Sequence, residues 1–419
     1  MTQQYTKPDS VQINKIMLSS VNGNKQTIDI AQYVVSFDIF EDMMFPCMRA
    51  EILINDAVDI ITSYPIIGEE MIEISFQNPG VDTIFDHTFQ VVRQSGNMFN
   101  QTGTSRMYAL HCISPEFVTN SAQYISEKQT GTIDSIIGSI LNNHLGSKKQ
   151  YNVEPTKGSQ TNLISRLRPF QAIDFHRKRA VSQQYASSSY CFFENQNGFN
   201  LLSMEYCLDK GQNNIGNKVF LYDKTQLTDS LKNNYRSIID MQQVSLSDNT
   251  KKHTQGSLNN TVRRFDLLTG KVQTTNYVNL QQQNKFKYAT KNPKALNTTS
   301  YEQKYGNSAA TTLLVPHSSE YAENYIDTSI GPKHSFVTKM GQNVYQLYIN
   351  GDVTIKAGDV ITVNVPNTTG DTSPTSDNRL YAGNYLVKSL RHIIILSSIS
   401  AQSYTVSLEI VKGFYEDYA

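Results

Sequence analysis

The chain has 419 residues, with 37 basic and 37 acidic side chains, so its formal net charge is zero. That balance argues against a dedicated nucleic-acid binder, which is normally basic. Apolar residues are spread along the whole chain, which argues against a disordered protein. At roughly 100–200 residues per domain the length suggests two to four domains. Composition alone names no function.

Targeting signals are absent from the sequence. The N-terminus is polar, without the apolar core of a signal peptide. The longest apolar runs, such as Ile393 to Leu396, are far shorter than the ~20 residues of a membrane span. We therefore expect a soluble protein made in a cytoplasm-like compartment. The four cysteines are far apart and are expected to be reduced, small apolar residues: Cys47, Cys112, Cys191 and Cys207.

Residues 1–115 are predicted to form strands, because apolar and polar residues alternate there with a period of two. Such a run of half-buried strands is typical of a small barrel or sandwich. The strand segments are Val11 to Leu18, Ala31 to Phe40, Met48 to Asn55, Glu70 to Phe76, His87 to Gln94 and Ser105 to Ser114.

The pattern changes in residues 116–205. Apolar residues at helical spacing predict a helix from Thr132 to His144, before Gly146. A second helix is predicted to begin at Pro169, a favoured first position. A hairpin is predicted to follow, with its turn at residues 195–198. This region is therefore expected to be an α+β unit.

Residues from about 250 to 335 are polar and rich in Asn, Gln and Thr, without clear periodicity. They fit either an extended excursion or a small strand-rich insert. Strands return from Val344 to the end of the chain.

The two β-rich regions resemble each other. Each has a strand, a Gly-acidic-apolar strand, a loop, a strand ending in a basic residue, a loop and a long strand. The alternative is that any two half-buried meanders share this alternation. If the repeat is real, a trimer presents six similar units with approximate sixfold symmetry. The repeated segments are RAEILIND, GEEMIEISF, HTFQVVRQ and SRMYALHCIS, against VYQLYINGD, AGDVITVNV, GNYLVKSLRH and SYTVSLEIV.

Three stretches resemble the central baseplate hub protein of contractile-tailed (T4-like) phages. This family is related to the N-terminal hub part of type VI secretion spike proteins. The stretches are FDIFEDMMFPCMRAEILINDAVDIITSYPIIGEEMIEISF (Phe37 to Phe76), RPFQAIDFHRKRA (Arg168 to Ala180) with the following YCFFENQNGFNLLS, and the C-terminal GDVTIKAGDVITVNVP, YAGNYLVKSLRH and YTVSLEIVK.

The resemblance implies a β-rich α+β fold with two similar small, tail-tube-like β-barrels. The first barrel is expected at residues 1–115 and the α+β domain at 116–205. The second barrel is expected to be split between 206–250 and 336–419, with 251–335 as an inserted polar domain. Its early strand then lies near Tyr235 to Ser247.

The resemblance also implies a function. A homotrimeric, pseudo-sixfold ring would join the hexameric tail tube, or its initiator proteins, to the trimeric cell-puncturing spike. DNA would pass through its bore without specific binding, and baseplate wedge proteins are further expected partners. The protein would be assembled in the host cytoplasm into the virion, away from membranes. Two alternatives are a tail-associated cell-wall-degrading enzyme and a receptor- or glycan-binding tail protein.

The sequence assigns no catalytic, cofactor-binding or metal-binding residue. The adjacent carboxylates Glu41-Asp42 and Glu69-Glu70 would point to opposite faces of a strand and are read as solvated surface. His111-Cys112 is the nearest approach to a metal pair, and strand alternation separates it as well. We therefore expect a structural protein rather than an enzyme.

Two further features have competing interpretations. The cluster from His176 to Arg179 fits the wet face of a helix or a protein contact, or else an anion-binding patch. Five tyrosines in the C-terminal strands fit either an interface or ordinary strand propensity: Tyr345, Tyr348, Tyr381, Tyr385 and Tyr404.

Charge is unevenly distributed along the chain. Residues 1–100 hold 5 basic and 13 acidic side chains, a balance of −8. Residues 101–300 hold 24 and 13, a balance of +11, and residues 301–419 hold 8 and 11, a balance of −3. Because phosphates adhere to basic surfaces, we hypothesise that acidic barrel faces line a bore that DNA crosses without sticking.

Overall fold

The structure is a computed structural model. It describes residues 9–20, 27–64, 66–99, 105–216, 218–222, 236–245, 258–266, 269–278, 285–288, 311–317, 326–366, 381–396 and 402–413, with short pieces at 248, 250, 254, 293–294, 304 and 415–416.

The first half of the β structure comes from the N-terminal region, where alternation places every second side chain in the core. In β4, for example, Ala50, Ile52 and Ile54 are buried while Glu51 is exposed. The strands are antiparallel, in the order β3-β4-β7-β6-β5-β1-β2. The elements are β1 (Gln12–Ser19), β2 (Thr27–Asp29), η1 (Ala31–Tyr33), β3 (Val34–Asp42), β4 (Arg49–Asp56), α1 (Ile60–Ser63), β5 (Met71–Gln77), β6 (Ile84–Phe99) and β7 (Arg106–Ile113).

The α+β unit follows, and both predicted helices are confirmed. One begins after Thr132, and its last turn is π-helical before Gly146, which has a φ of 63°. The other begins at Pro169. The elements are α2 (Pro115–Ala122), β8 (Ile125–Gly131), α3 (Ile133–Ser139), η2 (Ile140–His144), β9 (Tyr151–Val153), β10 (Gln160–Leu167), α4 (Pro169–Arg179), β11 (Tyr190–Asn195), β12 (Gly198–Ser203) and α5 (Met204–Asn213).

The predicted hairpin is β11–β12, and its second strand, expected over Phe199 to Glu205, ends at Ser203. The Ser203 hydroxyl accepts a hydrogen bond from the Tyr206 backbone N–H and so caps α5. The sequence signal for this helix start is a serine two residues before a glutamate.

The second half of the β structure combines a short early segment with the C-terminal region. The predicted early strand near 235–247 is β14, and it pairs with β19 across the intervening insert. The strand order is β14-β19-β22-β21-β20-β13. The strands are β13 (Val219–Leu221), β14 (Ile238–Ser245), β19 (Val344–Asn350), β20 (Val360–Asn364), β21 (Gly383–Ile395) and β22 (Ser403–Val411).

Of the two expectations for the insert, the described residues favour the strand-rich one. β15 (Asn259–Asp266) lies between β16 (Val272–Val278) and β18 (Thr311–His317). The helix α10 (Ile326–Met340) packs on this small sheet and runs past the expected boundary at 335. The short strands β17 (Pro293–Lys294) and β23 (Tyr415–Glu416) also pair.

The two halves repeat each other in strand order and in irregularities. β3, β4, β7, β6 and β5 occupy the places of β14, β19, β22, β21 and β20. The register shifts between Val91 and Arg93 in β6, and equally between Val387 and Ser389 in β21. β3 and β14 also share a shift near their starts. Since bulges are specific local features, their coincidence supports duplication over generic alternation.

The halves are joined into one thirteen-stranded sheet. The mostly antiparallel, β-rich fold is confirmed, but the described strands form a continuous open path rather than two separately closed barrels. The physical reason is the length of β21. Its first residues pair with β20, and Ser389 to Ile395 pair with β3, which leaves the halves sharing a hydrogen-bonded edge. We call this edge the seam.

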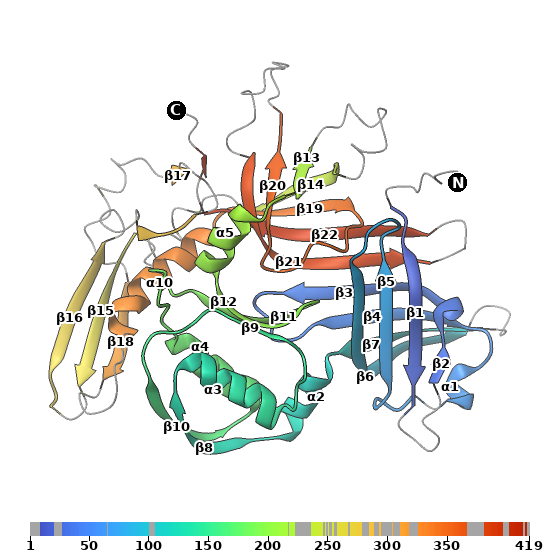
Figure 1. The fold of residues 1–419 in the computed structure, drawn as a ribbon, viewed down its shortest axis with the longest axis horizontal. Coiled ribbons are helices and arrows are strands. Elements are labelled where there is room, and N and C mark those ends of the chain that lie inside the picture. The colour runs from blue at the N-terminus through green and yellow to red at the C-terminus, as the bar shows by residue number, and fades with distance from the viewer. Residues whose placement is uncertain are drawn as a thin grey trace.

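One hydrophobic core serves both halves. The ring of Phe76 on β5 lies 5.7 Å from that of Tyr404 on β22 and 6.0 Å from that of His392 on β21. Figure 1 shows the first-half strands, at the right, beside the C-terminal strands. The helices α2, α3 and α4 lie together below them, and the β15–β16–β18 sheet of the insert lies at the left. Within the described part of the chain, no helix is long and apolar enough to cross a membrane.

Candidate interaction surface

Glu41, at the end of β3, departs from its predicted place on a solvated surface. Its side chain is buried and accepts hydrogen bonds from the backbone N–H groups of Gln196, at 3.0 Å, and Ala357, at 2.9 Å. Burial outweighs these two N–H groups and raises the pKa of Glu41 to about 8. Glu41 thus ties three segments together: the first half, the β11–β12 turn and the β19–β20 loop. Asp42 points outward, as alternation predicts.

Glu70 is the second buried carboxylate among the predicted surface pairs, whereas its neighbour Glu69 is exposed. Its two oxygens accept hydrogen bonds from the backbone N–H groups of Ile67 and Gly68, each at 2.9 Å. Gly68 has a φ of 96°, which favours glycine. Glu70 therefore closes a tight turn before β5, a role that alternation alone does not reveal.

A buried charged cluster joins the first half to the α+β unit. Glu194 on β11 is completely buried and accepts from the Met48 N–H at 2.9 Å and the Ser114 hydroxyl at 2.6 Å. Lys149 contributes the positive charge, with its Nζ 2.6 Å from Glu194 and 2.7 Å from Glu116. Burial lowers the pKa of Lys149, but the two carboxylates outweigh it and raise the pKa overall. We name Lys149, Glu116 and Glu194 the buried triad.

His87 lies beside the triad, with its Nε2 3.4 Å from Glu194. Burial, aided by the charge of Lys149, lowers the pKa of His87 to about 3. This imidazole is therefore neutral at physiological pH, and its contact with Glu194 is not an ion pair.

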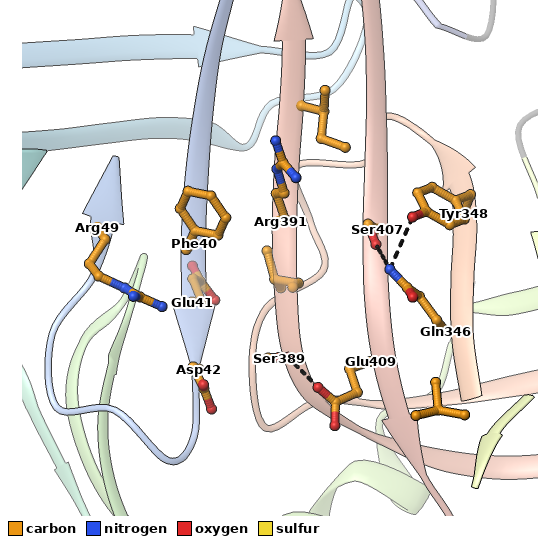
Figure 2. A pocket seen from close by; sticks show the side chains of 13 residues that line it. Phe40, Glu41, Asp42, Arg49, Gln346, Tyr348, Ser389, Arg391, Ser407 and Glu409 are labelled. Carbon is orange, nitrogen blue, oxygen red and sulfur yellow. Dashed lines mark hydrogen bonds between the residues drawn. The ribbon is translucent and has the colours of Figure 1, made fainter. Parts of the chain in front are cut away.

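The outward face of the sheet is hollowed along the seam. A hollow of about 370 Å³ receives side chains from six strands of both halves. Figure 2 shows Phe40 of β3 between Arg49 of β4 and Arg391 of β21. The guanidinium carbons lie 5.6 Å and 5.3 Å from the centre of the Phe40 ring, a cation–π arrangement. The hollow is lined by Phe40, Glu41, Asp42, Arg49, Val244, Gln346, Tyr348, Ser389, Leu390, Arg391, Ile393, Ser407 and Glu409.

A second hollow, of about 500 Å³, continues this face toward β6 and shares Phe40 and Arg49 with the first. The concave face therefore extends from β14 to β6, across both halves of the chain. We name this continuous surface the concave face.

Two carboxylates on the concave face pair with cations, and a third contacts a histidine ring. Arg391 donates to Asp38 at 2.7 Å, Lys388 donates to Glu409 at 2.6 Å, and His111 Nδ1 lies 3.1 Å from Glu51. Neutral polar groups fill much of the rest: in Figure 2 the Gln346 amide donates to the hydroxyls of Tyr348 and Ser407. Arg49 lies over the rings of Phe40 and Phe45, and Arg93 contacts His111. The face is therefore polar with charges of both signs, which differs from the purely acidic lining of our hypothesis.

The cluster at the end of α4 is largely engaged within the protein. His176 is buried, with its Nε2 2.7 Å from the Gln129 amide oxygen, and Arg177 donates to Asp174 and to the Tyr190 carbonyl. Arg179 stacks on Phe175, with its guanidinium carbon 3.6 Å from the ring centre. The contacts favour local packing over an anion-binding patch.

Other predicted candidates are in the core. All four cysteines are buried and free. Tyr345, Tyr385 and Tyr404 are fully buried, so their abundance reflects strand packing more than an interface. Among the described residues, no group of three His, Cys, Asp or Glu side chains is arranged to hold a metal ion.

No protein-family model and no curated protein matches this sequence. Solved structures do match it along nearly its whole length. The tail protein from Neisseria meningitidis MC58 is 10% identical, with a TM-score of 0.56, covering 95% of this chain and 96% of that one. The 43 kDa tail protein of prophage MuSo2 from Shewanella oneidensis is 7% identical, with a TM-score of 0.56, covering 96% and 99%.

A chain of the Francisella PdpA–VgrG complex is 8% identical, with a TM-score of 0.47, and covers 100% of this chain and 55% of that one. At such identities a likeness is one of fold. The predicted resemblance is confirmed at that level: this chain has the fold of phage tail proteins.

Proposed function

We propose that this chain is the structural hub of a contractile-tail baseplate. Three copies would place six β units in a pseudo-sixfold ring between the hexameric tail tube and the trimeric spike. The observation that carries the proposal is the repeated strand order, with its shared bulges, within a tail-protein fold. Such a duplication lets threefold symmetry meet sixfold symmetry.

The units of this ring would be the two tail-tube-like barrels at 1–115 and at 206–250 with 336–419. The α+β domain at 116–205 and the insert at 251–335 would lie outside it. The seam supports this assignment because it already joins the two β units edge to edge within one chain.

The concave face is the surface that we assign to the bore. Its ion pairs revise our acidic-lining hypothesis: DNA would pass with little adhesion because Lys388 and Arg391 are already neutralised by neighbouring carboxylates. A phosphate then finds few free positive charges to replace its counterions. Tube or tube-initiator proteins, the spike and wedge proteins would contact the outer rims, within the virion.

A cell-wall-degrading activity has less support. Glycoside hydrolysis needs two carboxyl groups facing one bond. Of the predicted acidic pairs, Glu41 and Glu70 are buried and bound to backbone N–H groups, and each points away from its neighbour. No specific observation favours the receptor-binding alternative.

The mass of the purified chain tests the proposal. Light scattering at micromolar concentration should give three chain masses, alone or with the spike protein added, and negative-stain images should show a ring with an open centre. A strict monomer under both conditions would contradict the proposal. Peptidoglycan zymography is the parallel assay, since a cleared band would favour the enzyme instead.

A further inference from the structure

We infer that β14 of one copy pairs antiparallel with residues 93–99 of β6 in the next copy. This would close the ring by repeating the internal seam between molecules. The inference rests on the proposed trimer, but it names the interface strands and their register.

The seam inside the chain is the template. β21 uses one edge for two partners: its first residues pair with β20, and Ser389 to Ile395 pair with β3. Its other edge is occupied by β22 throughout. The first strand of one β unit is thus added beside the outer part of the long strand of the other.

The counterparts of these two strands have open edges. β6 corresponds to β21, and its residues 84–90 pair with β5, the counterpart of β20. Beyond them, residues 91–99 pair with β7 on one side. In the described part of the chain no strand pairs with the other side. β14 corresponds to β3, pairs with β19 alone among the described strands and ends the sheet.

Both open edges carry exposed apolar side chains. On β6, Met98 is 71% exposed and Phe99 is 61% exposed. On β14, Val244 is 62% exposed and Ile239 is 49% exposed. Open edges of this kind normally carry charges or are covered, because they invite pairing with another chain. A second copy is the occupant that matches both edges at once, since the same chain supplies each of them.

The shared bulges set the register between copies. Arg93 and Ser389 both follow the bulge, so Ser95 in β6 corresponds to Arg391 in β21. Phe40 pairs with Arg49 of β4, and Ser245 pairs with Val344, the counterpart of Arg49 in β19. Because β14 has a second bulge between Gln243 and Ser245, the counterpart of Phe40 is Ser245.

Arg391 stands opposite Phe40 in the seam. The register therefore places Ser95 of one copy opposite Ser245 of the next. Met98 pairs with Met107 of β7 as Ile393 pairs with Thr405 of β22, so Met98 is the counterpart of Ile393. Ile393 stands opposite Asp38 in the seam, and the counterpart of Asp38 in β14 is Gln242. Met98 of one copy therefore faces Gln242 of the next.

The orientation of these side chains agrees with the register. The Ser95 hydroxyl lies 2.7 Å from Nε2 of His111, which lines the second hollow, and Gln242 stands opposite Gln346, which lines the first hollow. Both residues therefore belong to the concave face. A slip of one residue would place one of them on the opposite side of the sheet. Pairing at this register makes the concave face continuous from copy to copy.

Engineered cysteines test the register, because directly opposed residues in antiparallel strands have Cα atoms about 4.5–5.5 Å apart, within disulfide range. The double variants Ser95→Cys with Ser245→Cys, and Met98→Cys with Gln242→Cys, should form covalent trimers under mild oxidation on a non-reducing gel. The four native cysteines are buried and supply no background. The matched control is Ser95→Cys with Gln243→Cys, whose side chains would point to opposite faces, and we expect at least tenfold less cross-linked trimer.

The outcomes separate the interface from the function. Covalent trimers from both double variants, with little from the control, support the pairing. A trimer by light scattering that no double variant cross-links, or that the control cross-links better, overturns this interface and leaves the hub proposal standing. A monomer of every variant and of the parent chain overturns both.

Discussion

The two β halves of the chain share the same framework of hydrogen-bonded strands but differ in the residues at the strand ends. The last position of β4 shows this, because the shared register makes Asp56 the counterpart of Gly351. Buried Asp56 accepts hydrogen bonds from the N–H groups of Ile60 and Val58 and so begins α1. Gly351 instead leaves room for the Tyr404 ring. Duplication thus preserves strand order and bulges, while connections and anchors diverge.

The halves also differ in their attachment to the α+β unit. The first half is bound to a member of the buried triad, since Glu194 accepts hydrogen bonds from the Met48 N–H and the Ser114 hydroxyl, in addition to apolar contacts around Ile113. The second half packs Val360 and Leu386 against Phe193 and Leu208 in one apolar cluster. Its hydrogen bonds to the unit come from neutral amides, since Asn195 and Gln196 donate to the carbonyls of Ala357 and Val353. A charged anchor and a neutral anchor should respond differently to substitution.

The largest effect is expected from Lys149→Met, which leaves Glu116 and Glu194 buried without their cation. Removing one partner of a buried ion pair typically costs about 3–5 kcal/mol. Chemical denaturation followed by circular dichroism would measure the loss in free energy of unfolding. The control is Lys178→Met, whose exposed ion pair with Asp174 should contribute less than about 1 kcal/mol. Equal effects of the two substitutions would mean that the triad is not a special anchor.

Gly351→Ala tests the position at which the two halves diverge. A Cβ at this position would overlap the Tyr404 ring in the core, so the variant should be destabilised by about 1–3 kcal/mol or more. Gly341→Ala is the matched control, because its Cβ would meet only carbonyl oxygens at ordinary contact distances. If Gly351→Ala is as stable as the control, the core has more room beside Tyr404 than the structure shows.

The regular parts of this fold were predictable from the sequence for a physical reason. Period-two alternation and the helical spacing from Thr132 to His144 are local signals of burial, and they located most described strands and the two helices correctly. The position of β14 was also predicted, because the repeat required an early strand far from Val344.

Long-range contacts explain what the sequence did not reveal. The burial of Glu41 depends on N–H groups at Gln196 and Ala357, more than a hundred residues away. The seam depends on the length of β21 relative to β20, which no local pattern reports. Glu70 is different, since a glycine two residues before it is a local signal for the turn that it closes.

A pH measurement can distinguish the buried histidines of the two halves. Burial lowers the pKa of His392, on β21, to about 4, below the ordinary 6.5. Between pH 4 and pH 6.5 the unfolded chain therefore binds a proton on this histidine that the folded chain does not bind. The contribution of neutral His392 to the free energy of unfolding is complete above about pH 6.5 and is lost as the pH falls toward 4. Between pH 7 and pH 5 this histidine alone should account for about 2 kcal/mol.

His392→Phe should remove that share of the pH dependence. The variant also loses the contact between His392 Nδ1 and the Tyr404 hydroxyl at 2.8 Å, a cost that does not vary over this pH range. The informative quantity is therefore the difference in unfolding free energy between pH 7 and pH 5, in parent and variant. An unchanged difference would show that His392 is not held neutral. Replacing His87, in the first half, should reduce the pH dependence of the unfolding free energy in the same direction, because the pKa of His87 is lowered to about 3.

The smallest expected effect concerns the surface of the seam. Arg391 pairs with Asp38 and stacks on Phe40, but its side chain is 45% exposed. Exposed ion pairs usually contribute about 0.2–1 kcal/mol and weaken with salt. A double-mutant cycle with Arg391→Ala and Asp38→Ala should give a coupling energy in that range, smaller at 1 M than at 0.1 M salt. A coupling above about 2 kcal/mol would mean that side chains on the concave face, rather than the backbone pairing of β3 with β21, hold the two halves together.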